Sequence, residues 1–496
     1  MAHLICFVLL SSLGTQAFAK SSQADSAQPN IVLMVADDLG YQDVECYGAS
    51  LIKTPNIDGL AKQGVRFTDA HSISAICMPS RYGILSGTYY FHGKRRPLYG
   101  FQFHDGQVTL PSLMKSGGYK TAALGKWHNG LGTERVVNYN AALKPGPLEI
   151  GFDSFFGTPR SHNEPPLVFV EGHHVVGLEA DDPISVDMSP QFGVHGRMRG
   201  GKKARAARPD EKIDMILADK AAKFFEQQKP DQPFFLYLAF QAPHTPLNPA
   251  PEFRGKSKAA IYGDYIQQLD YCTGVVLNAL EKEGLSENTI VIFTSDNGGR
   301  FEEEALRAGH RPNGNLIGQK TDAWEGGHRV PCIARWPKHI PPGSERNELF
   351  VLIDLMATLA EAAGIDMPKG ASPDGASELD AFKNPTSPAK RTEAVLHGTG
   401  PSSYILRQDD WVYIPKQGSG GKTVPEPKRP WSLPYGELGF KNSDVDDKGQ
   451  IKQGAPKVQL YNLRNDPNQS SNVAAAHAEK VKAMDGRLNA LLGRTK

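Results

Sequence analysis

Three stretches of the chain consist of apolar residues that run without interruption into polar ones. They are residues 30–40 (NIVLMVADDLG), 234–240 (FFLYLAF) and 289–299 (TIVIFTSDNGG). An apolar run of this length predicts a strand that is buried on both faces, as in the parallel sheet of an α/β protein. Ligands bind beyond the carboxyl ends of such strands, so the polar residues at these ends are candidate site residues.

Amphipathic patterns lie between the predicted strands. Residues 210–228 and 261–284 repeat apolar side chains at the three- and four-residue spacing of a helix that is buried on one face. Buried strands that alternate with such helices predict an α/β fold. We therefore expect one large domain, residues 29–370, with a mostly parallel central sheet flanked by helices.

The pattern changes after about residue 370. Residues 371–395 contain several Pro and Ser residues and predict a linker or loop. Short strand patterns follow in residues 402–416 and 458–467, and a last helical pattern covers 472–493. We expect a smaller C-terminal subdomain, residues 396–496, built of antiparallel strands and a helix.

The first residues have the pattern of an export signal. An apolar run at residues 4–13 is followed by Ala-Phe-Ala at 17–19, which predicts a signal peptide, residues 1–19, and an exported protein, periplasmic or secreted. The alternative, a buried N-terminal strand, is disfavoured by the polar spacer at residues 20–28. No later apolar run is long enough to span a membrane, so no membrane span is expected.

Net charge and cysteine content argue against some classes of partner and of structural site. The net charge of +1 over 496 residues argues against nucleic acid as a partner and makes any anion selectivity local. Four cysteines follow the signal (Cys46, Cys77, Cys272 and Cys332), too few and too scattered for a disulfide framework. No pair has the C-x-x-C spacing of a structural zinc site.

One of these cysteines stands in an unusual context, residues 77–90 (CMPSRYGILSGTYY). If a helix begins here, Pro79 suits its first turn and Ser80 helps to cap it. Cys77 and Arg81 then lie on adjacent turns of one face, close to unpaired backbone N–H groups, which is an arrangement that binds anions. The alternative is a buried structural thiol beside an arginine that neutralises an acid.

Oxygen-bearing side chains end two of the predicted strands. Asp37 and Asp38 follow the first strand, and Asp296 and Asn297 follow the third. Either pair alone is typical of a helix cap. Two pairs at the same edge of one sheet favour a site for a hard cation, calcium or magnesium.

Further cations and histidines follow in loops rich in Gly and Pro. Lys126 and His128 lie in LGKWHNG, His244 in APHTP, and Lys320 in GQKTDAWEGGHRVP. Single residues of these types are usually structural or solvated. Their positions near strand ends make them candidates for the same site.

These motifs together resemble the formylglycine-dependent (type I) sulfatases of the alkaline phosphatase superfamily, from about residue 29 to the C-terminus. C-x-P-S-R begins at Cys77, and G-K-W-H, A-P-H-x-P, S-D-N-G and G-x-K-x-x-x-W-E-G-G follow in family order. The resemblance implies that Cys77 is oxidised to formylglycine by a maturation enzyme that reads Pro79 and Arg81. It also implies an alkaline-phosphatase-like catalytic domain.

The resemblance further implies one calcium ion, with magnesium less favoured. Its ligands would be Asp37, Asp38, Asp296, Asn297 and an oxygen of residue 77. A hydroxyl of the hydrated formylglycine would attack sulfur, with Asp296 as the base, and give a covalent sulfo-enzyme intermediate.

The remaining roles implied by the family concern the sulfate and the protons. Arg81, Lys126 and Lys320 would hold the sulfate oxygens, where charge develops. His244 would donate a proton to the leaving alcohol, with Lys320 sharing this role. His128 would take a proton from the second hydroxyl and so release sulfate.

The substrate is less closely defined. Residues 151–172 are similar to a segment of arylsulfatase A-like and N-acetylgalactosamine-6-sulfatase-like members in which a serine touches the sulfate, and Ser161 is the matching residue. His162 and Arg160 are candidate sugar contacts; each is otherwise an ordinary loop residue. These features imply an exo-acting O-sulfatase of sulfated carbohydrates, with galacto-configured sugars as candidates.

Two loops are expected to frame the pocket mouth, residues 157–171 and the basic stretch 197–208. For the basic stretch the alternative is a solvated loop. Two other functions stay open. One is a phosphonate or phosphate ester hydrolase of the same superfamily, and the other is an unmatured glycan-binding protein.

Overall fold

The computed structural model describes residues 28–93, 100–134, 136–187, 196–229, 231–400, 403–423 and 435–493. The predicted signal peptide, residues 1–19, and all of the spacer except Gln28 lie outside this part of the chain. Among the described residues, no helix has both the length and the apolar character that crossing a bilayer requires.

A ten-stranded mixed sheet forms the centre of the large domain, in the order β13-β2-β12-β11-β1-β10-β4-β5-β6-β7. Its strands are, in that order, β13 (Ser344–Arg346), β2 (Val65–Phe67), β12 (Cys332–Arg335), β11 (Thr289–Ser295), β1 (Asn30–Asp37), β10 (Phe234–Pro243), β4 (Lys120–Lys126), β5 (Ser154–Thr158), β6 (Val170–Glu171) and β7 (His174–Val175). The five strands from β11 to β5 are parallel to one another. The predicted α/β fold is confirmed.

The three predicted strands are the middle of this sheet. β1 pairs with β10 on one side and with β11 on the other, and residues 31–37 are all buried. Continuous burial explains the unbroken apolar runs, since both faces of each strand are covered. β4 and β5, which complete the parallel part, were not expected from the sequence.

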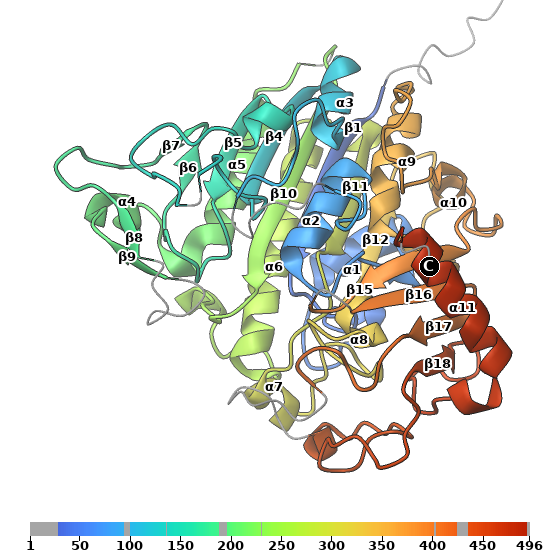
Figure 1. Cartoon of the computed structure of the whole chain (residues 1–496). Coiled ribbons are helices and arrows are strands. Elements are labelled where there is room, and N and C mark those ends of the chain that lie inside the picture. The colour runs from blue at the N-terminus through green and yellow to red at the C-terminus, as the bar shows by residue number, and fades with distance from the viewer. Residues whose placement is uncertain are drawn as a thin grey trace, which may run out of the picture.

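Helices cover both faces of the sheet (Figure 1). α2 (Cys77–Ser86), α3 (Leu110–Ser116) and α9 (Leu355–Ala362) pack on the face that presents Ile31, Leu33 and Val35. α1 (Pro55–Lys62), α5 (Ile213–Glu226) and α6 (Ala260–Lys282) pack on the opposite face, with Val32 and Met34. Side chains alternate along β1, so successive residues of this strand pack into two separate hydrophobic cores.

The C-terminal subdomain is a four-stranded antiparallel sheet with one long helix. Its elements are β15 (Glu393–His397), β16 (Tyr404–Gln408), β17 (Trp411–Ile414), β18 (Gln459–Asn462) and α11 (Ala478–Leu491). In Figure 1 it lies at the lower right, beside the large domain. The residues expected to be a linker, 371–395, contain the short helix α10 (Leu379–Lys383) and the beginning of β15.

Short elements complete the described chain. They are the strand pairs β3 (Ala70–His71) with β14 (Phe350–Val351) and β8 (Ser185–Asp187) with β9 (Arg197–Arg199), and the helices α4 (Lys202–Ala206), α7 (Glu303–Arg307) and α8 (Glu325–His328).

A buried ionic cluster joins the subdomain to the large domain. Asp69 Oδ1 lies 2.8 Å from His71 Nε2 and 3.2 Å from Arg329 Nη2, and Asp69 Oδ2 accepts a hydrogen bond of 3.1 Å from Arg407 Nη2. Arg407 belongs to β16, whereas the other residues belong to the large domain. The pairing neutralises a carboxylate whose burial would otherwise be costly.

The subdomain also holds residues 319–325 through hydrogen bonds. Ala323 N donates to Ser419 O (2.6 Å), Lys422 N to Asp322 Oδ1 (2.7 Å), Trp324 Nε1 to Gln459 Oε1 (2.9 Å) and Glu325 N to Gln469 Oε1 (2.8 Å). Lys320 therefore lies in a segment whose backbone is fixed from both parts of the protein.

Candidate active site

The two predicted oxygen pairs meet at the carboxyl edge of the sheet. Because β1 lies directly beside β11, Asp38 N can donate a hydrogen bond of 3.2 Å to Asp296 Oδ1. Asp38 has a φ of 65°, a left-handed conformation that is uncommon for residues other than glycine and that turns the chain sharply after β1. The sheet thus brings together residues that are 258 positions apart.

The helix that was expected after residue 76 is present, but its cap is different. α2 begins at Cys77, and Ile76 is its N-cap residue, without a side-chain capping bond. Ser80 lies inside the helix, where its Oγ donates to Ser74 O at 2.9 Å. The expectation that Ser80 caps this helix is therefore wrong. Pro79 lies in the first turn, as expected.

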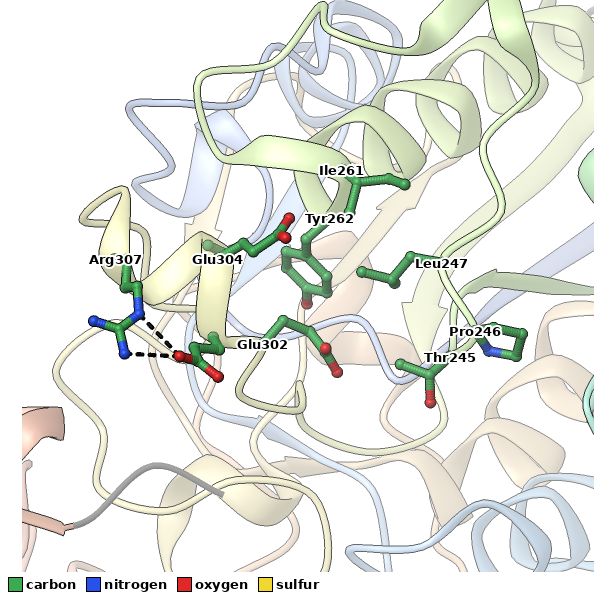
Figure 2. Close-up of a pocket in the computed structure, with 10 residues that line it drawn as sticks. Thr245, Pro246, Leu247, Ile261, Tyr262, Glu302, Glu304 and Arg307 are labelled. Carbon is green, nitrogen blue, oxygen red and sulfur yellow. Dashed lines mark hydrogen bonds and ion pairs between the residues drawn. The ribbon is translucent and has the colours of Figure 1, made fainter. Parts of the chain in front are cut away.

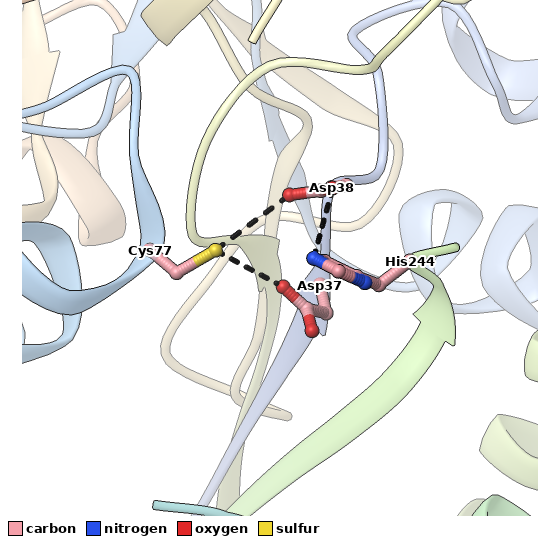
Figure 3. A group of neighbouring side chains, drawn as sticks. All are labelled: Asp37, Asp38, Cys77 and His244. Atoms are coloured by element: carbon pink, nitrogen blue, oxygen red, sulfur yellow. Dashed lines mark hydrogen bonds and ion pairs between the residues drawn. The ribbon is translucent and has the colours of Figure 1, made fainter. Parts of the chain in front are cut away.

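Cys77 lies at the centre of the group of polar side chains. Its Sγ is 3.4 Å from Asp37 Oδ1 and 3.7 Å from Asp38 Oδ1 (Figure 3). Lys320 Nζ lies 3.3 Å from the same Sγ. Burial and the Asp296 carboxylate raise the pKa of the Cys77 thiol well above its usual value. The thiol is therefore protonated at neutral pH and is a poor nucleophile.

Three cations pair with the three carboxylates. Lys126 Nζ donates to both oxygens of Asp37, at 2.8 and 2.7 Å, and Lys320 Nζ donates to Asp38 Oδ2 at 2.7 Å. Arg81 Nε donates to Asp296 Oδ2 at 2.8 Å. The formal charges of these six groups cancel. A divalent cation added to the group would leave it positive, which favours an anionic substrate.

The donor set fits a hard cation. Asn297 Nδ2 donates to Asp38 Oδ1 at 2.8 Å, while the buried Asn297 Oδ1 has no hydrogen-bond partner among the described residues. Such an atom is expected where a ligand completes the site. One ligand atom each from Asp37, Asp38, Cys77 and His244 lies within 4.8 Å of the others (Figure 3). His244 contributes a ring nitrogen to this group, so the candidate acid lies beside the candidate ligands.

Of the two candidate catalytic histidines, His244 is buried and His128 is partly buried. His244 Nε2 lies 3.6 Å from Asp38 Oδ2, and its Nδ1 is 2.6 Å from Thr245 O. Burial and the nearby Lys320 lower the pKa of His244 well below its usual value. Burial and Lys126 do the same to the pKa of His128.

The loop at residues 157–171, which contains the candidate sulfate contact Ser161, runs beside His128. Backbone hydrogen bonds from Trp127 N to Thr158 O and from His128 N to Pro159 O, both 3.0 Å, align the two segments. Ser161 follows in this loop; its Oγ is buried and has no partner among the described residues. A buried, unpaired hydroxyl is available to a ligand.

His162 is also buried beside the site. Its ring stacks on Tyr265 with the centroids 6.2 Å apart and meets the ring of His244 edge-on at 5.8 Å. Burial lowers the pKa of His162 to about 4, so it is neutral at neutral pH. Arg160, the other expected sugar contact, is half-buried.

Three polar residues near the site were not expected. Gln241 Oε1 accepts from His162 N at 3.1 Å, and Glu164 Oε2 lies 3.6 Å from His128 Nε2. Arg208 Nη2 donates to His162 O at 3.1 Å. Arg208 belongs to the basic stretch 197–208 but is buried, so this residue is neither solvated nor on the surface. Gln241 has a sequence signal, since it interrupts an apolar strand.

A cavity of about 600 Å³ is lined in part by Thr245, the residue that follows His244 in the chain (Figure 2). Thr245, Pro246 and Leu247 line one side, and Glu302 with α7 lines another. Figure 2 shows the side chains of Thr245, Leu247 and Glu302 around the same space. The cavity is large enough for a sugar ring, and one of its lining residues, Thr245, directly follows the candidate acid in the chain.

A comparison with protein families gives one match: the Sulfatase family model covers residues 29–365. The chain belongs to the sulfatase family. It is therefore a sulfuric ester hydrolase, and the family resemblance inferred from the motifs is confirmed. Sulfatases generally use a formylglycine and a metal ion, and Cys77 belongs to a group of side chains that could hold a metal ion.

Two curated sulfatases show how widely the family varies. The chain is 34% identical to the N-acetylgalactosamine-6-O-sulfatase of Bacteroides thetaiotaomicron, over 96% of this chain and 95% of that one. It is also 34% identical to the steryl-sulfatase of Mus musculus, over 70% of this chain and 64% of that one. Membership of the family fixes the reaction but not the alcohol that carries the sulfate.

A solved sulfatase structure confirms the architecture. It comes from work on the metabolism of multiple glycosaminoglycans by Bacteroides thetaiotaomicron and superposes with a TM-score of 0.82, at 34% identity, over 94% of this chain and 100% of that one. The agreement spans both the large domain and the C-terminal subdomain.

Proposed function

We propose that this sulfatase removes O-sulfate groups from the ends of sulfated carbohydrates, with galacto-configured sugars as its substrates. The observation that carries the proposal is the position of Cys77 against Asp37, Asp38 and Lys320 at the bottom of a charged site. The extensive match to an N-acetylgalactosamine-6-O-sulfatase supports the galacto configuration and suggests the 6-position.

The proposal includes maturation and export. A maturation enzyme would oxidise Cys77 to formylglycine, and the chain would act in the periplasm or outside the cell, consistent with its leading residues. We also propose that residues 29–370 form the catalytic domain and 396–496 a subdomain that supports it.

Asp37, Asp38, Asp296 and Asn297 would hold one divalent cation, calcium rather than magnesium, together with an oxygen of residue 77. When bound, the cation would make a hydroxyl of the hydrated formylglycine more acidic. Asp296 would take the proton of that hydroxyl as its oxygen attacks sulfur.

The cations and histidines would act on the sulfate and on the two remaining protons. Arg81, Lys126 and Lys320 would hold the sulfate oxygens, where negative charge grows. His244, with Lys320, would protonate the leaving alcohol, whose sugar ring would occupy the adjoining cavity. His128 would take a proton from the second hydroxyl of residue 77 so that sulfate departs.

A panel of substrates tests the proposal. We expect kcat/KM to be highest for galactose or N-acetylgalactosamine 6-sulfate, lower for the gluco epimers and the 4-sulfates, and lowest for a phosphate diester. A preference for the phosphate diester would favour a phosphoesterase. Mass spectrometry of the residue 77 peptide from the natural host should show the aldehyde; an unmodified thiol would support a glycan-binding protein.

The replacement Ser161→Ala should lower kcat/KM for every sulfate ester, small aryl sulfates included, by about 10²-fold, because it removes a donor to the sulfate. Ser286→Ala is a matched control: Ser286 Oγ is also buried without a partner among the described residues, but it lies before β11, at the other edge of the sheet. Equal activities of the two variants would contradict the proposed role of Ser161.

The basic stretch should matter only for long substrates. Lys202 and Lys203 are exposed on α4, and Lys203 pairs with Glu179 at 2.7 Å. Replacing both lysines with serine should leave aryl sulfates unaffected and weaken the capture of sulfated oligosaccharides at low salt, with the deficit shrinking as salt screens the charges. The exposed Lys282→Ser is the control. An equal loss for all substrates would mean that α4 supports the fold instead.

A further inference from the structure

Glu164 faces the histidine to which we assign sulfate release. Its Oε2 lies 3.6 Å from His128 Nε2, and the two side chains are 11% and 16% exposed. Catalytic contacts are often this long without substrate and tighten in the complex. A carboxylate on this side of the ring favours a proton on Nε2.

The other ring nitrogen is then the basic one. His128 Nδ1 is buried and has no hydrogen-bond partner among the described residues. In a neutral imidazole one nitrogen carries the proton and the other accepts one, so a proton held on Nε2 leaves Nδ1 as the acceptor. A contact with Glu164 that holds the proton on Nε2 would leave Nδ1 as the base.

The backbone brings these two residues together. His128 has a φ of 55°, in the left-handed region, and its N–H donates to Pro159 O at 3.0 Å. Glu164 N donates to Ser161 O at 2.9 Å, which turns the loop back toward His128. A strained residue fixed by a neighbouring loop is typical of a functional position.

The charged groups around His128 shift its pKa in opposite directions. Lys126, Arg81 and Arg160 oppose its protonation and, with burial, keep its pKa low; Glu164 acts in the opposite direction. When His128 accepts a proton, the Glu164 carboxylate is therefore placed to stabilise the resulting imidazolium.

We propose that Glu164 is a positioning residue for His128: its carboxylate holds the proton on Nε2 and presents Nδ1 as the base for sulfate release. This inference rests on the proposed function. In that step Nδ1 takes the proton of the second hydroxyl on residue 77. The hydroxyl oxygen forms the aldehyde double bond, the carbon–oxygen bond to the sulfate breaks, and sulfate leaves with the electron pair.

Two replacements separate the charge from the acceptor. Glu164→Gln keeps an acceptor but removes the charge, and Glu164→Leu removes both at similar volume. We expect turnover to fall by about 10- to 100-fold, the range seen when a residue that orients a functional histidine is lost, with the leucine variant slower. Glu149 is the matched control, since it pairs with His173 Nε2 at 2.8 Å away from the site. Glu149→Gln and Glu149→Leu should keep full turnover.

Two readouts distinguish positioning from a structural role. Nitrogen NMR of labelled histidine, assigned with His128→Gln, should show His128 protonated on Nε2 in the unmatured wild-type protein and shifted toward Nδ1 in Glu164→Leu. In the matured variants, enzyme that carries a sulfate group on residue 77 should accumulate during turnover, as seen by intact mass.

Each outcome is decisive. A wild-type His128 protonated on Nδ1, unchanged turnover in both Glu164 variants, or a loss of turnover with neither a tautomer change nor accumulated sulfated enzyme would overturn the role of Glu164. Failure of the matured wild-type protein to hydrolyse any sulfate ester would instead overturn the proposed function, and the tautomer measurement would still stand by itself.

Discussion

Cys77→Ala should fold normally and lose hydrolysis of aryl sulfates by about 10⁴-fold or more, the scale of losing a catalytic nucleophile. Alanine cannot be oxidised to an aldehyde, so no hydroxyl can attack sulfur. The site itself should survive, because the paired groups around residue 77 keep their partners: Lys126 stays on Asp37, and Lys320 stays on Asp38. The measurement is kcat/KM with the thermal midpoint of unfolding.

Cys272→Ala is the matched control. Cys272 is another buried thiol, within α6, on the opposite face of the sheet from α2. This variant should retain activity while losing some stability through the small cavity it creates. Substantial turnover by Cys77→Ala, measured on protein free of wild-type enzyme, would rule out the formylglycine mechanism.

Asp296→Asn should produce the second-largest loss, greater than that of Lys320→Ala. Asp296 accepts hydrogen bonds from Arg81 Nε at 2.8 Å and from Asp38 N at 3.2 Å. The side chains of Asp296 and Arg81 are both fully buried. Neutralising it would leave Arg81 without its partner, weaken the cation site and remove the proposed base. We expect kcat/KM to fall by about 10³-fold or more.

The metal content of the variant separates these causes. Elemental analysis should find about one calcium per wild-type chain and less in Asp296→Asn, because the carboxylate and amide oxygens of the site suit a hard cation. Exhaustive chelation with verified loss of metal should abolish turnover, and calcium should restore it. A full rate in the metal-free protein would refute the requirement for a cation.

The sequence was sufficient to predict the middle of the sheet and the edge that carries the site. Strands buried on both faces have unbroken apolar runs, and the polar residues that end them are conspicuous. β4 was missed because its sequence, KTAALGK, is rich in small residues and begins and ends with lysine. Its position next to β10 follows from pairing with a neighbour, which a local pattern does not encode.

The helix α2 shows a different limit of prediction from sequence. All ten residues of α2 are buried, so the helix has no polar face and no amphipathic pattern. The C-x-P-S-R motif drew attention to this segment, whereas its hydrophobic pattern did not. The misplaced cap has the same origin: Ser80 reaches back to Ser74 O, a contact set by tertiary packing.

Contacts between loops that are distant in the sequence could not be predicted either. Glu164 and His128 are brought together by backbone pairing between two loops that follow neighbouring strands. Arg208 resembles its exposed neighbours in a basic run, yet it is buried beneath His162. Burial of one charged residue among several depends on the surrounding fold.

The hydrogen bonds between the C-terminal subdomain and residues 319–325 limit where the chain can be cut and joined to that of another sulfatase. Hydrogen bonds from Ser419, Lys422, Gln459 and Gln469, among others, hold this segment, which carries Lys320. A crossover placed at the apparent boundary near residue 390 would combine Lys320, the lysine proposed to hold sulfate, from one parent with the supporting subdomain of the other. Recombination between sulfatases therefore has to exchange residues 319–325 and the subdomain as one block.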